Sequence, residues 1–227
     1  MSVRLLFVCM LLFNGILVAA ASADGVTQQE RLQHFQEGGL ITWVSALQLL
    51  AIAAVSARLS RLRYRMQPAA TRWFNWRAAF VVWAAIALGF CFLAVDELTE
   101  IHESLDQSLH ELFGISETGL TDRLDDLLVM LYAASGLGLL YVYRREIGRY
   151  RTALPFLISG FSLLFGSILI DTLTNRPDVL SAVLPPSQIA TFSFNLAVLE
   201  ELLKLLSEGC FLVGFWAALR TVSHKLS

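Results

Sequence analysis

Long apolar runs are the feature that most constrains how this chain can fold. Five of them follow the N-terminal region, at Leu40–Ala57, Ala78–Val95, Leu124–Tyr143, Leu154–Ile170 and Leu196–Leu219. Each has about 17 to 25 residues, the length that an α-helix needs to cross the hydrocarbon core of a bilayer. None shows the alternating pattern of a membrane β-strand. The sequence therefore predicts an all-α, polytopic transmembrane helix bundle of five spans.

The composition agrees with a chain that has little outside the lipid bilayer. Of its 227 residues, 56% are apolar and 16% are charged, and the mean hydropathy is +0.61. Cys9, Cys91 and Cys210 all lie in apolar runs without CxxC spacing, which argues against a disulfide framework, a c-type haem and a thiolate zinc site. No nucleotide-binding loop is present, and we expect no nucleic-acid partner.

The first 23 residues have the layout of a secretory signal peptide. Arg4 precedes an apolar stretch that ends in Ala21-Ser22-Ala23, a small-residue pattern typical of cleavage sites. The alternative is an uncleaved signal anchor, because Leu5–Ala21 approaches spanning length and would make a sixth span. Thr27 and Glu30 then form a predicted capping box. We expect residues 24–39 to form a periplasmic amphipathic helix, followed by the five-span bundle over residues 40–227.

Positive charges set the expected orientation. Most of the 17 Lys and Arg residues fall on one side of a five-span arrangement, among them Arg58, Arg61, Arg63, Arg65, Arg144, Arg145, Arg149, Arg151, Arg220 and Lys225. The positive-inside rule makes that side cytoplasmic. We therefore predict a multi-pass protein of the bacterial inner membrane with a periplasmic mature N-terminus and a cytoplasmic C-terminus.

The acidic residues gather on the opposite side. Among the 19 Asp and Glu residues, only Glu146 lies on the predicted cytoplasmic side. Such a surface would concentrate cations or dock a basic periplasmic protein.

The densest acidic stretch is Val95–Glu111, for which we predict a periplasmic helix over residues 96–113. At helical spacing Asp96, Glu100, Glu103, Gln107 and His110 share one face, while His102 pairs with Asp106 at i, i+4. Glu97 points away from that face. The alternative is an amphipathic interfacial helix whose polar face is simply hydrated.

Other spans bring acids to the same membrane level. Asp126 begins the third span, where helix capping is the alternative explanation, and Asp171 ends the fourth. In the last span Glu201, Lys204 and Glu208 form one stripe, and Glu208 lies about 18 Å above the inner boundary, well inside the ~30 Å core. A charge there must be paired, hydrated or protonated. Lys204 and Glu208 are therefore predicted catalytic residues that tune charge or move protons, unless they form a buried pair that only helps the helices pack.

Carboxylates with one or two imidazoles are the ligands that iron, manganese and zinc accept. The predicted ligands of such a divalent metal ion are Asp96, Glu100, His102, Glu103, His110, Asp126, Asp171 and Glu201.

Two pieces of the chain, "FLAVDELTEIHE" and "LEELLKLLSEG", resemble paired signatures of uncharacterised bacterial multi-span inner-membrane proteins. Those proteins carry a D-E-x(4)-H-E segment after one span and a Glu-Glu pair in the last. The resemblance implies no established activity. It singles out Asp96, Glu97, His102, Glu103, Glu200 and Glu201, and so agrees only in part with the helical phase, which turns Glu97 and His102 away from Asp96.

Three functions fit these observations. The first is a membrane metalloprotein with a periplasm-facing carboxylate/histidine site, and specifically a metalloenzyme. The second is a proton- or cation-coupled transporter that uses Lys204 and Glu208, against which stands the lack of inverted repeats. The third is a non-catalytic assembly or partner subunit with an acidic docking face. Metal content of the purified protein discriminates the first from the third.

Overall fold

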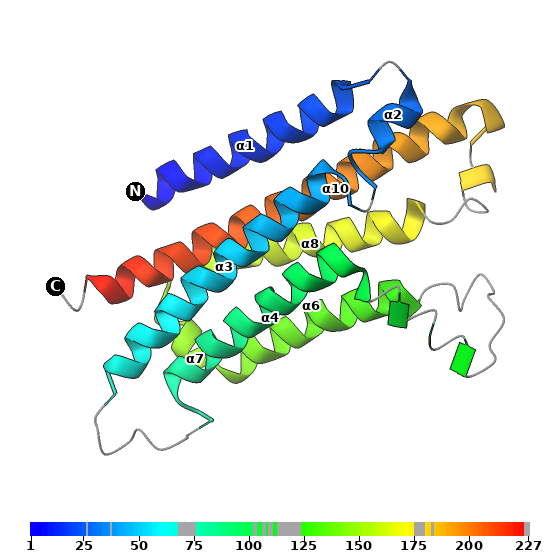
Figure 1. The fold of residues 1–227 in the computed structure, drawn as a ribbon. Helices are drawn as coiled ribbons and strands as arrows, with labels where there is room; N and C mark the ends of the chain where they lie inside the picture. Colours follow the sequence, from blue (N-terminus) through cyan, green and yellow to red (C-terminus); the bar gives the residue numbers. More distant parts are fainter. Residues whose placement is uncertain are drawn as a thin grey trace.

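The computed structural model of the chain is a bundle of helices (Figure 1). It describes residues 1–25, 27–36, 38–67, 76–101, 104–105, 108, 111–112, 124–174, 180–182 and 184–224, with side chains throughout except at 124–126 and 173–174. Five helices within these residues are long and apolar enough to cross a membrane. The predicted all-α, multi-pass membrane fold is therefore confirmed.

The long helices differ from the predicted spans in two respects. Those of spanning length are α1 (Val3–Ala23), α3 (Leu40–Arg65), α4 (Ala79–Thr99), α8 (Leu154–Thr174) and α10 (Pro186–Ser223). They thus include the predicted signal peptide. The third predicted span appears as α6 (Leu124–Val142), whose part with described side chains, Leu127–Val142, is apolar and shorter than the other spans.

Local sequence explains several helix ends. The short α2 (Gln28–Leu32) begins with the predicted capping box, in which Thr27 and Glu30 bond each other's backbone N–H. It stops at Leu32, so the predicted helix over 24–39 is wrong in length: turns follow, with Gly38 at a φ of 70° that suits glycine. Pro186 occupies the first turn of α10, where its missing N–H costs nothing.

The bundle is organised around α3 and α10. Helix α3 packs against α4 and α10, α8 and α1 each pack on α10, and α6 lies against α8 and α4 (Figure 1). The main core contains Ile52, Leu59, Val82, Trp83, Phe211 and Phe215. At Gly160 a Cβ atom would lie 2.8 Å from the Phe211 ring, so glycine lets α8 approach α10 closely. Large apolar side chains such as Leu88 and Ile158 face outward, as lipid contact requires.

Charged groups separate to the two ends of the bundle. We call the end with Glu97, Asp171 and Glu201 the acidic end; the basic end carries the C-terminal ends of α3, α6 and α10 and the short α7 (Arg144–Ile147). At the basic end the carboxylate of Glu146, which is 6% exposed, accepts bonds from Arg63, Arg149 and Tyr150 at 2.8, 2.9 and 2.7 Å. These four residues are the Glu146 cluster. Burial, together with the bond to Glu146, raises the pKa of Tyr150 above its ordinary value.

Candidate functional site inside the bundle

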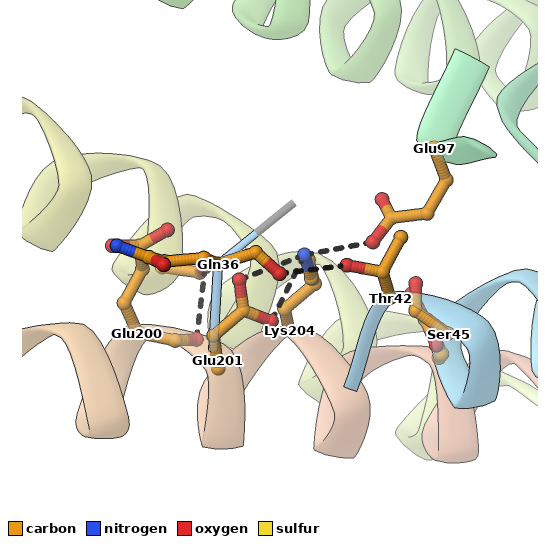
Figure 2. A network of polar contacts seen from close by, with 9 residues as sticks. Gln36, Thr42, Ser45, Glu97, Glu200, Glu201 and Lys204 are labelled. Carbon is orange, nitrogen blue, oxygen red and sulfur yellow. Dashed lines mark hydrogen bonds and ion pairs between the residues drawn. The ribbon is translucent and has the colours of Figure 1, made fainter. Parts of the chain in front are cut away.

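Lys204 is the centre of a polar network at the acidic end (Figure 2). Its ammonium donates to Glu97 Oε1 at 3.0 Å and to Glu201 Oε1 at 2.9 Å, and it also lies 2.9 Å from Glu201 Oε2. Glu97 comes from the last turns of α4, whereas Glu201 and Lys204 are one turn apart on α10. We call these three residues the Lys204 cluster. It joins two helices that are distant in sequence.

The Lys204 cluster is mostly enclosed and has unequal charges. The side chains of Lys204, Glu97 and Glu201 are 25%, 19% and 13% exposed. Two carboxylates share one ammonium, so the cluster carries one net negative charge when all three groups are ionised. Partial burial strengthens both the attraction and the repulsion, because the surrounding dielectric constant is lower than that of water. One further positive charge, such as a proton, would therefore neutralise the cluster.

Glu208 lies further along α10 towards the basic end, and its side chain is inside the bundle. The residue is 5% exposed, and Ser45 of α3 donates a hydrogen bond to its Oε1 at 2.6 Å. Its Oε2 is buried and has no hydrogen-bond partner among the residues described. The prediction that Glu208 faces the interior, with a polar group in reach, is confirmed. The bonded partner is Ser45 rather than Lys204, because the ammonium is engaged by Glu97 and Glu201.

A second pair of polar side chains lies beside this site. Asn14 of α1, which is fully buried, donates to the carbonyl oxygen of Leu205 at 2.7 Å, and Gln48 of α3 donates to Asn14 Oδ1 at 2.9 Å. Gln48 is one turn from Ser45, and Leu205 lies between Lys204 and Glu208 on α10. Sequence reasoning missed Asn14, Ser45 and Gln48. The available signal was their rarity, since each is a polar residue inside an apolar run.

The acidic stretch after α4 departs from the predicted geometry. Asp96 and Glu97 belong to the last turns of α4, where Asp96 is 5% exposed and Glu97 reaches Lys204. Glu97, predicted to lie off the face that Asp96 and Glu100 share, is the α4 carboxylate that bonds Lys204. Glu100 adopts a left-handed conformation with φ 54° and ψ 41°, so the helix that starts in α4 does not continue through it. The common face predicted for Asp96, Glu100 and His110 on one helix is interrupted there.

The predicted metal ligands are brought together only in part. Among the residues that the structure describes, no group of three His, Cys, Asp or Glu side chains is close enough to hold a metal ion. His102, Glu103, His110 and the side chain of Asp126 lie outside the described part of the chain. Asp171 is half-buried one turn beyond Ser167, whose hydroxyl donates to the Glu200 carbonyl oxygen at 3.1 Å. Glu201 is the predicted ligand that the structure places in the Lys204 cluster.

Fold and site together define a multi-pass helical membrane protein with a partly buried cluster of one lysine and two glutamates between its helices. The chain belongs to a family described as a domain of unknown function, DUF8692, whose model matches residues 3–219. This agrees with the resemblance to uncharacterised proteins and leaves the two sequence motifs without an assigned role. No curated protein and no solved structure matches the chain.

Proposed function

We propose that this is a proton-linked protein of the bacterial inner membrane, in which Glu208 exchanges a proton with the periplasm by way of the Lys204 cluster. The proposal takes the basic end as cytoplasmic, because Arg63, Arg149 and Arg220 lie there and the positive-inside rule favours that orientation. The acidic end then faces the periplasm.

The observation that carries the proposal is that Oε2 of Glu208 is buried and has no hydrogen-bond partner in the described part of the chain. A carboxylate inside the membrane costs several kcal/mol unless its charge is compensated. Ser45 supplies one hydrogen bond to the other oxygen. A proton on Oε2 would remove the charge, which makes Glu208 a natural place for a proton to reside and leave from.

Lys204 provides the link to the acidic end. It is four residues from Glu208, and such residues are neighbours on one helix face, with about 5–6 Å between Cβ atoms. When the proton of Glu208 passes to Glu97 or Glu201, the ammonium loses one of its two charged partners. It can then pair with Glu208, which has become a charged carboxylate. The net change is one proton moved from Glu208 to the cluster, and the reverse sequence returns it.

Infrared difference spectroscopy of the protein in liposomes tests this proposal. We expect a carbonyl band of a protonated carboxyl group that responds to external pH, is absent in Glu208→Gln and changes its pH response in Lys204→Met. Glu200→Gln is the matched control, since it removes a neighbouring carboxylate of α10 that is not in the cluster. A band that survives Glu208→Gln, or one that ignores pH, would contradict the proposal.

A divalent metal ion (iron, manganese or zinc) at the acidic end stays a prediction. Asp96 favours it, because this carboxylate next to Glu97 in the chain is 5% exposed. The described residues do not complete such a site, since the Lys204 ammonium already occupies the position between Glu97 and Glu201. His102, Glu103 or His110 would have to supply ligands. Metal content of the wild type beside Asp96→Ala and Glu201→Ala checks it.

A further inference from the structure

We infer that α1, whose sequence resembles a signal peptide, stays in the mature protein as a transmembrane helix and forms one wall of the site around Glu208. The polar contacts of Asn14 carry this inference. Asn14 is fully buried and bonds both the Leu205 carbonyl oxygen of α10 and the Gln48 side chain of α3. A signal peptide needs only an apolar core, and Asn14 weakens that core. Its amide instead satisfies groups of two other helices.

Removal of α1 would take hydrogen-bond partners away from buried groups of α3 and α10. Gln48 is 6% exposed and would lose its hydrogen-bond partner, in a region where no water replaces it at low cost. Gly209 of α10 also fits α1: a Cβ atom there would lie 3.3 Å from Asn14 Nδ2 and 3.4 Å from Met10 Cβ. Small residues at helix contacts allow this close approach in membranes.

Helix α1 lies alongside α10 (Figure 1), and the two helices are in contact near both ends of α1 and at its middle. Near its end, Val18 and Ala21 pack with Ile41 and Leu205 in a separate apolar cluster. At its start, the Met1 carbonyl oxygen accepts bonds from Trp216 and Arg220 of α10 at 3.4 and 3.2 Å. Helix α1 therefore runs antiparallel to α10, from the basic end to the acidic end.

The predicted cleavage site is itself held in structure. Ala21, which a signal peptidase would have to recognise, is 2% exposed. The helix continues to Ala23, and the Asp24 backbone N–H donates to the Ala20 carbonyl oxygen. The Asp24 carboxylate then bonds His34 at 3.0 Å. Cleavage after Ala23 would require the last turn of α1 to unwind and Ala21 to leave its contacts.

The family match is an independent observation that also supports the retention of α1. Its model begins at residue 3, so the shared domain includes nearly all of α1. A removable leader would not be expected to form part of a domain that also contains α10.

Intact-mass measurement and N-terminal sequencing test the inference on the full chain, expressed in a bacterium with a C-terminal tag and purified from membranes. We expect residues before Asp24 to be retained in the membrane-inserted protein. An N-terminus at Asp24 would overturn the inference, whatever role Glu208 has.

The thermal stability of Asn14 and Gln48 variants tests whether α1 packs against the helices around Glu208. Asn14→Leu should lower the apparent Tm in detergent by about 2–4 °C, as expected for loss of one interhelical hydrogen bond in a chain of this size. Gln48→Leu should do the same, and the double variant should lose less than the sum of the two. Ile16→Leu is the control, because Ile16 is 66% exposed on α1, and it should leave Tm unchanged. Equal Tm values for Asn14→Leu and the control would show that α1 is not a wall of the site.

Discussion

The Lys204 cluster and the Glu146 cluster are built from the same kinds of contacts with opposite signs. At the acidic end, one ammonium is shared by Glu97 and Glu201 at 3.0 and 2.9 Å. At the basic end, one carboxylate is shared by Arg63 and Arg149 at 2.8 and 2.9 Å. Each cluster ties together helices that are distant in sequence. The difference lies in the buried carboxylate at each place, Glu146 in one cluster and Glu208 beside the other.

The carboxylate of Glu146 is fully satisfied, because two guanidinium groups bond Oε2 and the Tyr150 hydroxyl bonds Oε1. Glu208, beside the Lys204 cluster, keeps one buried oxygen without a partner among the described residues. Complete satisfaction makes a rigid structural link, whereas an unused acceptor in a low-dielectric site can receive a proton. The comparison therefore supports a structural role for the basic end and the proposed proton exchange at the acidic end.

The largest expected effect is on the Glu146 cluster. Glu146→Ala leaves the Arg63 guanidinium, 14% exposed, without its carboxylate. Removal of one partner from a buried ion pair costs about 3–5 kcal/mol. We expect a large fall in apparent Tm in detergent and poor recovery of folded protein.

Arg149→Ala is the matched control for this change. The Arg149 side chain is 62% exposed, and Arg63 and Tyr150 still hold Glu146 without it. A loss of less than about 1 kcal/mol is expected for a surface ion pair. Similar losses in the two variants would contradict the structural role of the buried carboxylate.

A smaller effect is expected for Lys204→Met, at roughly 2–3 kcal/mol near neutral pH, because the cluster is partly exposed and its loss falls below that of a fully buried pair. The physical cause is repulsion between Glu97 and Glu201 once the ammonium is gone. Acidification neutralises carboxylates, so the deficit in Tm should shrink as pH falls.

Lys204→Arg retains the positive charge and should keep most of the stability. Thermal unfolding followed over a series of pH values measures both variants. A deficit in Lys204→Met that stays constant with pH would show that carboxylate repulsion is not its cause, and the proposed proton link would lose its electrostatic basis.

The fold follows from hydropathy, because a bilayer admits helices of one approximate length and few alternatives. The runs beginning at Leu40, Ala78 and Leu154 all appear as helices within one residue of their predicted starts. Helix ends were less accurate, and α10 begins ten residues before the predicted Leu196. The polar residues before that point lie outside the apolar run, so hydropathy does not detect a helix that extends beyond the membrane.

The site was predictable where one helix determines it. Glu201, Lys204 and Glu208 share a stripe by their spacing alone, and the buried position of Glu208 followed from its distance to the helix end. The contact of Glu97 with Lys204 depends on how α4 is rotated against α10, which the spacing within α4 does not contain. Ser45, Gln48 and Asn14 depend in the same way on α1 and α3. The motif resemblance did include Glu97, although it gave no physical reason.

Apart from the control variants, the smallest expected effect is that of Tyr150→Phe, which separates the hydroxyl's contribution from that of the two arginines. The variant removes the 2.7 Å bond to Glu146 Oε1, and a hydrogen bond to a charged group contributes about 1.5 kcal/mol at the lower end of its range.

The effect should depend on pH in a defined direction. Burial, and then the bond to Glu146, raises the pKa of Tyr150 above its ordinary value of 10.0, so the folded state favours the neutral phenol. Its stabilisation is complete below about pH 10 and is lost as the pH rises towards the folded-state pKa. The difference in Tm between the wild type and Tyr150→Phe should therefore be constant near neutral pH and narrow above about pH 10.

Tyr141→Phe, at an exposed position on α6, is the control and should show neither effect. A difference that grows in alkali would mean that the phenolate is stabilised in the folded protein, and the Tyr150 hydroxyl would then not be the donor that satisfies Glu146 Oε1.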